Sequence, residues 1–295
     1  MKLSVVIPTY NRRKSFERCL ESVFTQSYKP FEIIVVDSSE DIDQNLANKY
    51  KIKAESYGLK LRYIIDRPPT GVAASRNVGI KNSKGDIIVF IDDDCVADKY
   101  WLENLAKEFN DEDVAVVGGK ISWELDSMNN KNSRIIKYWN RFNQKEVTRY
   151  AIVTANSAFR KEAIESIGGF DETLKRLEDF DVGIRLRLNG LKIKYSEKAK
   201  VYHELPKNVR DIVRIMYSDG FYFAHLSKKY GSVDPDHFNP SNVVARMVVR
   251  FLLSLIKIPF FIFDFKKFVS NIFTVISIFS SLVGFIFGLR KVARL

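Results

Sequence analysis

Short apolar runs alternate with amphipathic stretches over residues 1–120. The apolar runs are continuous, which is typical of strands buried on both faces of a parallel sheet. The predicted strands are Leu3–Ile7, Glu32–Val36, Leu61–Ile65, Ile87–Ile91 and Val114–Val117. The predicted helices between them are Arg13–Gln26, Asp41–Tyr57, Val72–Asn82 and Trp101–Phe109. This alternation predicts an α/β fold with a doubly wound, mostly parallel sheet.

The pattern becomes less regular over residues 121–205. The polar residues 122–150 predict a loop around Asn129–Asn132. Beyond it we expect the helices Lys161–Ile167 and Leu177–Leu188 and a short strand that ends at His203.

From about residue 207 the sequence predicts helices with long apolar stretches. We predict helices over Val209–Tyr217 and Gly220–Tyr230, and an apolar segment over Val243–Phe263 that breaks at Pro259. Phe268–Leu289 carries no charged residue over 22 positions. A helix of that length spans about 33 Å, which is enough to cross the hydrocarbon core of a bilayer.

The net charge of +11 is unevenly distributed over the 295 residues. Residues 206–295 hold 13 Lys and Arg against 5 Asp and Glu, whereas residues 1–205 hold 34 against 31. A basic and apolar tail indicates an anionic membrane surface rather than nucleic acid, and the sequence has no recognisable nucleic-acid-binding motif. We therefore expect a domain over residues 1–205, with halves 1–120 and 121–205, and a helical membrane-associating region over residues 206–295.

Basic residues flank both ends of the last apolar segment, namely Lys266, Lys267, Arg290, Lys291 and Arg294. The positive-inside rule disfavours a single crossing with both ends basic. Re-entrant or in-plane helices keep every basic side chain on the cytosolic face, whereas a hairpin leaves Lys266 and Lys267 on the far side. The alternative is a soluble dimer interface or a buried core, and the oligomeric state stays open.

Neither the start of the chain nor its cysteines point to secretion. Met1–Pro8 has the pattern of a first strand rather than of a secretory signal. Two cysteines are too few for a disulfide framework. We expect the protein at the cytoplasmic face of the cell membrane.

Three consecutive carboxylates, Asp92, Asp93 and Asp94, follow an apolar strand. In doubly wound sheets, ligands bind beyond the carboxyl ends of the strands, and Asp37 occupies an equivalent position. Adjacent carboxylates suit Mg²⁺ or Mn²⁺ bridged to substrate phosphates. Continued strand alternation predicts that Asp92 and Asp94 project to one side. The alternative is a solvated acidic turn.

Further acidic residues, Glu178, Asp179 and Asp181, open a predicted helix. The helix dipole favours such residues at this place, but one carboxylate near a diphosphate is also the base that a sugar hydroxyl needs. His203 ends a predicted strand and is either a structural histidine or a metal ligand.

Two basic segments are candidates for binding anions. Arg76 precedes the acidic strand and is either a phosphate or carboxylate partner or a surface arginine. Thr9–Arg12 forms a polar turn before a helix N-terminus, which suits an anion, although Arg12–Lys14 also fits a solvated charge run. The sequence has no glycine-rich P-loop, which argues against a Walker-type NTPase.

Taken together, these segments resemble family 2 glycosyltransferases with the GT-A fold. The motifs of the first half are Val6–Arg12, Ile34–Asp37, Ala74–Gly79 and Gly85–Asp94. Those of the acceptor-side half are Thr154–Arg160, Gly168–Asp171 and Glu178-Asp179. The resemblance covers about residues 1–205.

The resemblance implies an inverting enzyme of the hexosyltransferase type that uses a nucleotide-diphosphate sugar and Mn²⁺ or Mg²⁺. It implies donor or nucleotide contacts at Pro8, Thr9, Asn11, Asp37, Arg76, Asp92 and Asp93. It implies metal ligands at Asp92, Asp94 and His203, the catalytic base at Asp179, and acceptor-side positions at Asn156, Glu178 and Asp181. Asp181 also competes with Asp179 as base. The turn Ser38–Glu40 departs from the usual glycine-containing turn of the family.

The expected acceptor is a lipid-linked or membrane glycan. A Gln-x-x-Arg-Trp motif is absent after residue 200, which favours transfer of a single sugar over polymerisation. Two alternatives are a sugar nucleotidyltransferase and a non-catalytic membrane-binding module with the same fold.

Overall fold

The computed structural model describes all residues except 42–43, 69–70, 123–151, 205–207, 260–264 and 294–295. Nearly all of the loop expected over residues 122–150 lies outside the described residues. The chain divides into two compact units. One comprises Met1–Leu125 and Thr148–Glu204, and the other comprises Asp126–Val147 and Leu205–Leu295.

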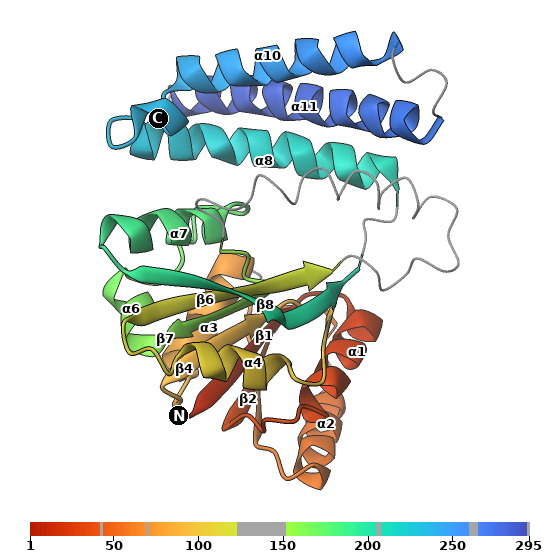
Figure 1. Cartoon of the computed structure of the whole chain (residues 1–295). Coiled ribbons are helices and arrows are strands. Elements are labelled where there is room, and N and C mark those ends of the chain that lie inside the picture. The colour runs from red at the N-terminus through yellow and green to blue at the C-terminus, as the bar shows by residue number, and fades with distance from the viewer. Residues whose placement is uncertain (42–43, 69–70, 123–151, 205–207, 260–264, 294–295) are drawn as a thin grey trace. The chain divides into compact units, whose positions relative to one another are not determined.

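The described part of the first unit contains one sheet of eight strands (Figure 1). The strands are β1 Leu3–Thr9, β2 Glu32–Asp37, β3 Leu61–Ile65, β4 Ile87–Ile91, β5 Cys95–Ala97, β6 Val114–Ser122, β7 Asn156–Arg160 and β8 Lys192–His203. Their order is β3-β2-β1-β4-β7-β6-β8-β5. Strands β1 to β4 pair in parallel, as do β6 and β8, whereas β7 and β5 run antiparallel to their neighbours. The prediction of a mostly parallel α/β sheet is confirmed.

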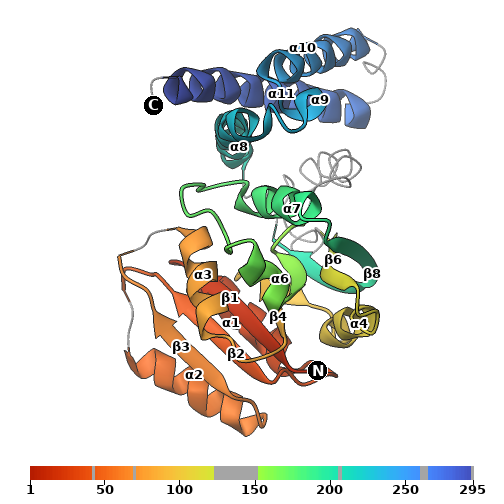
Figure 2. The ribbon, with the colours of Figure 1, turned by 90° about the vertical axis from the view of Figure 1, so that its left-hand side faces the viewer.

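Helices cover both faces of this sheet (Figure 2). They are α1 Arg13–Phe24, α2 Gln44–Ser56, α3 Val72–Asn82, α4 Trp101–Glu108, α6 Lys161–Ser166 and α7 Glu178–Leu188. Val5 and Ile7 of β1 pack in the cluster with α1, α2 and α4, whereas Val6 between them packs in the cluster with α3, α6 and α7. Burial on both faces explains the continuous apolar runs of the central strands.

Strands β5 and β7 lack the apolar runs of the central strands and were not predicted. Strand β5 has three residues, and β7 reads Asn-Ser-Ala-Phe-Arg, with polar residues that are nevertheless buried. The short strand expected before His203 is longer than the pattern indicates, because β8 extends over 12 residues with a largely exposed first half.

The second unit is helical in its described residues. Its helices are α8 Val209–Tyr230, α9 Pro235–Phe238, α10 Pro240–Lys257 and α11 Phe265–Val292. The prediction of two helices over 209–230 is wrong, because α8 continues through Gly220. This glycine is a packing residue, since a Cβ atom there would collide with the carbonyl oxygen of Ser281 in α11. Helix α11 packs against both α8 and α10 (Figure 1).

A buried asparagine joins three elements of the first unit. Asn156 at the start of β7 is 1% exposed. Its Oδ1 accepts from Trp101 Nε1 of α4 at 2.8 Å. Its Nδ2 donates to the carbonyl oxygens of Lys120 and Ala199, each at 2.9 Å, which lie on β6 and β8. These three groups therefore depend on one buried amide for their hydrogen bonds.

We expect Asn156→Ala to lower the free energy of unfolding by about 3 kcal/mol, since it leaves buried donors and acceptors unsatisfied. Urea unfolding followed by circular dichroism measures the change. The control is Asn110→Ala at an exposed position after α4, which should change stability by less than about 0.5 kcal/mol. Equal stability of the two variants would contradict the central role of Asn156.

Candidate active site

The three consecutive aspartates lie in a turn at the edge of the sheet. Asp92–Asp94 connect β4 to β5, and the amide of Cys95 donates to the carbonyl oxygen of Asp92. The strand alternation that we expected for Asp92 and Asp94 is therefore wrong. Each of the three carboxylates has its own surroundings, as the following contacts show.

Asp93 connects the acidic turn to the end of β1. Its Oδ2 accepts from Thr9 Oγ1 at 2.8 Å, and Arg12 Nη1 lies 3.4 Å from its Oδ1. Burial raises the pKa of Asp93 to about 6, while the positive charge of Arg12 opposes the rise. Asp93 and Thr9 thus position the turn against a central strand.

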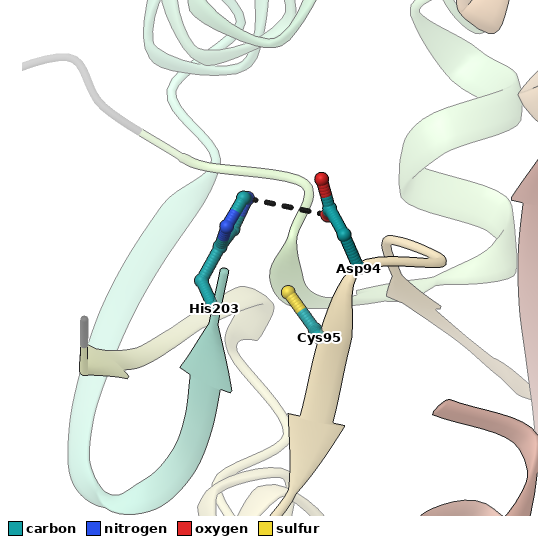
Figure 3. Close-up of side chains that lie close together, drawn as sticks. All are labelled: Asp94, Cys95 and His203. Atoms are coloured by element: carbon teal, nitrogen blue, oxygen red, sulfur yellow. Dashed lines mark ion pairs between the residues drawn. The ribbon is translucent and has the colours of Figure 1, made fainter. Parts of the chain in front are cut away.

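Asp94 and His203 face each other across the end of the sheet (Figure 3). His203 ends β8, and its Nε2 lies 3.4 Å from Asp94 Oδ1. His203 Nδ1 lies 2.7 Å from the carbonyl oxygen of Glu204, which can only accept, so Nδ1 carries a proton. In neutral His203 the Nε2 lone pair then points toward a carboxylate oxygen. A proton on Nε2 or a bound cation would each make this contact attractive.

A divalent cation fits this place. Asp94 Oδ1 is buried and has no hydrogen-bond donor among the described residues. Asp94, His203 and the buried Cys95 each offer a ligand atom, and these atoms lie within 4.8 Å of one another. The Nδ1 contact with a carbonyl oxygen is the outer hydrogen bond that metal-ligating histidines usually have. Carboxylate oxygens suit Mn²⁺ and Mg²⁺, imidazole nitrogen suits transition metals, and a Cys95 thiolate would suit softer metals.

Arg12 already supplies one positive charge to the same turn. Its Nη1 lies 2.5 Å from Asp94 Oδ2, and its side chain is largely exposed. Burial alone would lower the pKa of Arg12, but the carboxylates of Asp94 and Asp93 raise it above its usual value. The sequence suggested only an anion site or a charge run at this position.

Arg76 of α3 forms a buried bridge between two elements. It is 2% exposed, so the alternative of a surface arginine is wrong. Its Nη2 donates to Asp92 Oδ1 at 2.8 Å, and its Nη1 donates to Glu178 Oε1 at 2.5 Å. The guanidinium also lies over the ring of Phe170, 5.6 Å from its centroid. Arg76 therefore fixes the acidic turn relative to the start of α7.

The other two acidic residues of α7 have different surroundings. Loss of hydration raises the pKa of Asp179 to about 7, and the negative charge of Glu178 adds to the rise. Asp181 is fully buried, and its Oδ2 accepts from Arg185 Nε at 2.7 Å. Arg185 in turn donates to the carbonyl oxygen of Ile167. Asp179 is thus poised to exchange a proton near neutral pH, whereas Asp181 is held in an ion pair.

Asp37 and Asn11 lie where β2 and β1 end. Asp37 Oδ1 accepts from the amide of Ser39 at 2.8 Å, and its Oδ2 accepts from the hydroxyl of Tyr63. Asn11, with a φ of 52°, donates its amide to Ser39 Oγ at 2.8 Å and accepts from the amide of Glu40 at 3.1 Å. The turn without glycine is therefore closed by side chains. The tyrosine was missed, because its apolar strand gave no sign of a polar partner.

The remaining site predictions stay predictions. Pro8 pairs with Val36 inside the sheet, next to Thr9. The amide of Asn156 is fully occupied by contacts within the fold. The structure brings Thr9, Arg12 and the acidic turn together, and Arg76 adds the start of α7.

The acidic turn follows the carboxyl end of β4, which is where ligands bind in doubly wound sheets. The family model for glycosyl transferase family 2 matches residues 4–168, and that for glycosyl transferase family group 2 matches residues 87–290. The chain belongs to family 2 of the glycosyltransferases and has their GT-A fold.

Curated relatives carry glycosyltransferase names. Glycosyltransferase AglE of Haloferax volcanii is 28% identical over 176 residues, which are 58% of this chain and 57% of AglE. The O-antigen chain rhamnosyltransferase RfbN of Salmonella typhimurium is 24% identical over 277 residues, covering 89% of this chain and 84% of RfbN. The chain spans 57% and 61% of the length of AglE and of an uncharacterized Haemophilus influenzae glycosyltransferase.

A solved structure shares the fold. The mannosyltransferase PcManGT from Pyrobaculum calidifontis, in complex with GDP-Man and Mn²⁺, superposes with a TM-score of 0.69 at 17% identity. The alignment covers 97% of this chain and 87% of PcManGT.

We expect Arg12→Gln to bind Mn²⁺ more tightly than the unchanged protein in the absence of any sugar donor. The variant removes a cation that competes for Asp94, and we expect a gain on the order of fivefold. Loss of the free Mn²⁺ signal in electron paramagnetic resonance measures the affinity. Arg13→Gln is the matched control, because Arg13 contacts Glu17 instead and should leave the affinity unchanged. Weaker binding by Arg12→Gln would show that Arg12 does not compete with the metal.

Proposed function

We propose that the protein is an inverting, metal-dependent glycosyltransferase that moves one sugar from a nucleotide-diphosphate sugar to a hydroxyl of a lipid-linked or membrane glycan. The observation that carries this proposal is the buried bridge from Asp92 through Arg76 to Glu178. It ties a turn suited to a metal and a diphosphate to a helix that bears a candidate base. Family membership favours sugar transfer over nucleotidyl transfer or a purely membrane-binding role.

In this proposal the ends of β1 and β2 bind the nucleotide through Pro8, Thr9, Asn11 and Asp37. Asp92, Asp94 and His203 would hold Mn²⁺ or Mg²⁺, with Asp93 positioning the turn. The cation would neutralise the diphosphate as it leaves. The names of two solved structures support such a donor, since PcManGT was solved with GDP-Man and Mn²⁺, and TarS of S. aureus with UDP.

Asp179 is the proposed base. Its carboxylate accepts the proton of the acceptor hydroxyl while the oxygen attacks the anomeric carbon from the side opposite the diphosphate. Such an in-line attack inverts the configuration at that carbon. Glu178 keeps Arg76 in place and, by its charge, keeps the proton affinity of Asp179 high.

The proposed acceptor is attached to a membrane lipid at the cytoplasmic face of the cell membrane. A glucosyl-dolichyl phosphate glucuronosyltransferase of Haloferax volcanii is 26% identical over 225 residues, covering 70% of each chain. Among the described residues, Thr274–Val292 forms one helix segment long and apolar enough to cross a membrane. In this proposal residues 1–205 carry out the chemistry, and residues 206–295 bind an anionic membrane surface. Nucleic acid is not a partner.

A donor screen tests the proposal. The full chain is incubated with nucleotide sugars, Mn²⁺ and a membrane lipid extract, and release of nucleoside diphosphate is measured. We expect release from at least one donor, with loss of more than about a hundredfold in Asp94→Ala. Full activity of Asp94→Ala would refute metal-dependent transfer, and diphosphate release from a nucleoside triphosphate and a sugar phosphate would favour nucleotidyl transfer.

We expect the transfer rate to depend on a single ionisation near neutral pH. Asp179 must be deprotonated to act as base, so kcat should fall as the pH drops through about 7. Glu178→Gln removes the neighbouring negative charge and should move this acid limb to lower pH. The measurement is kcat against pH with saturating donor.

Asp179→Asn should lower kcat on the order of a thousandfold at every pH. Its control is Asp113→Asn, at an exposed position away from the acidic turn. An unshifted acid limb in Glu178→Gln would assign the ionisation to another group.

A further inference from the structure

Away from its ends, α10 has three sides in its described residues. One side packs against the other helices of the second unit, and two sides face away from them. Val243, Met247 and Ser254 lie on the packed side. The apolar face of α10 is exposed and consists of Val248, Val249, Leu252, Leu253, Leu255 and Ile256. The basic edge of α10 consists of Arg246, Arg250 and Lys257, which recur at helical spacing beside that face. A helix with an exposed apolar face and a basic border is typical of membrane interfaces.

Thr274–Val292 of α11 is long and apolar enough to cross a membrane, but its backbone packs closely against α8. Cβ atoms on Gly284 and Gly288 would collide with the carbonyl oxygens of Tyr217 and Phe221. Ser281 Oγ donates to the carbonyl oxygen of Met216 at 3.0 Å. The partners advance together along both helices, so α8 and α11 run in the same direction with their backbones in close contact.

Because α8 packs along α11, charged residues of α8 lie beside the apolar segment Thr274–Val292. Asp219 lies in the turn between Tyr217 and Phe221, level with Gly284 and Gly288. Arg214 lines an open groove together with Phe279 and Ser280. If Thr274–Val292 crossed a bilayer, these two charges would enter the hydrocarbon with it, which is strongly unfavourable.

We propose that α8, α10 and α11 lie in the plane of an anionic membrane surface, with the apolar face of α10 among the acyl chains and its basic edge at the headgroups. The geometry keeps both ends of α11 on one side of the membrane. The inference rests on the proposed membrane association and not on the sugar chemistry. The charge of the basic edge favours anionic lipid over a second copy of the chain, because two such edges repel each other.

Flotation of the full chain with vesicles tests the surface. We expect binding to vesicles of phosphatidylcholine with phosphatidylglycerol, and little binding to phosphatidylcholine alone. Ile256→Ser should weaken binding by about tenfold. Ile52→Ser is the matched control, since Ile52 of α2 is 67% exposed and Ile256 is 61% exposed. Circular dichroism confirms that both variants are folded.

Lys257→Gln and Lys49→Gln form a second matched pair of exposed lysines, on α10 and α2. We expect weaker vesicle binding only for Lys257→Gln. Equal effects within either pair would overturn the assignment of the membrane-binding face to α10. A dimer in solution that Ile256→Ser dissociates, without any change in vesicle binding, would assign the apolar face of α10 to a second copy instead.

Cysteine labelling in intact cells tests the in-plane arrangement. The native Cys19 and Cys95 are buried, so we expect neither to react with a membrane-impermeant maleimide. Lys257→Cys and Lys291→Cys place a thiol at exposed positions near the end of α10 and near the end of α11. We expect neither variant to be labelled in intact cells and both to be labelled after lysis.

The alternative topologies give different labelling. Labelling of Lys291→Cys in intact cells would show that α11 crosses, and labelling of Lys257→Cys would show a hairpin. Either result overturns the in-plane arrangement while leaving membrane association intact. A full chain that binds no vesicles at all would instead refute the proposed membrane association, and nucleoside diphosphate release in the donor screen reports on the sugar chemistry independently.

Discussion

Mutual repulsion among carboxylates at one edge of the sheet is the constraint on which the site depends. Asp92, Asp93 and Asp94 share one turn, and Glu178 and Asp179 begin a neighbouring helix. Two guanidinium groups offset part of this charge, a buried one on Arg76 and an exposed one on Arg12. The buried one is fixed by two carboxylates and an aromatic ring, so it acts as a permanent part of the fold. The exposed one, Arg12, is the cation that we expect a bound divalent metal to displace.

The same constraint requires supports that hold the charges in fixed positions. A buried ion pair is costly unless its geometry is well defined. The turn that carries Asp93 is tied to β1, which is paired on both sides and buried on both faces. Arg76 projects from α3, which packs in the cluster beneath the same strands. Rigid strands therefore hold the charges close enough for one arginine to serve two carboxylates.

Local sequence patterns predicted the central sheet and the carboxylates that follow Ile87–Ile91, because burial on both faces and a strand-end position both leave clear local signals. The turn that these carboxylates form was not predicted. The edge strands escaped prediction, since β5 is short and β7 is built from small and polar residues. Pairings between distant residues carry no local signal. Asp94 meets His203 because β5 pairs with β8, where Cys95 lies opposite His203. Arg76 meets Glu178 because α3 and α7 pack in the same cluster. Gly220 was taken as the start of a second helix, because glycine is common both at helix boundaries and where two helices pack closely.

The glycine contacts between α8 and α11 also determine where a shortened version of the chain can end. The two backbones meet where Gly220, Gly284 and Gly288 leave no room for a side chain. In a fragment that keeps α8 and lacks α11, the side of α8 that α11 normally covers would be exposed to water, including Tyr217 and Phe221. Such a fragment would aggregate readily. A boundary placed between β8 and α8 keeps α8 and α11 on the same side of the cut, so this helix pair stays undivided.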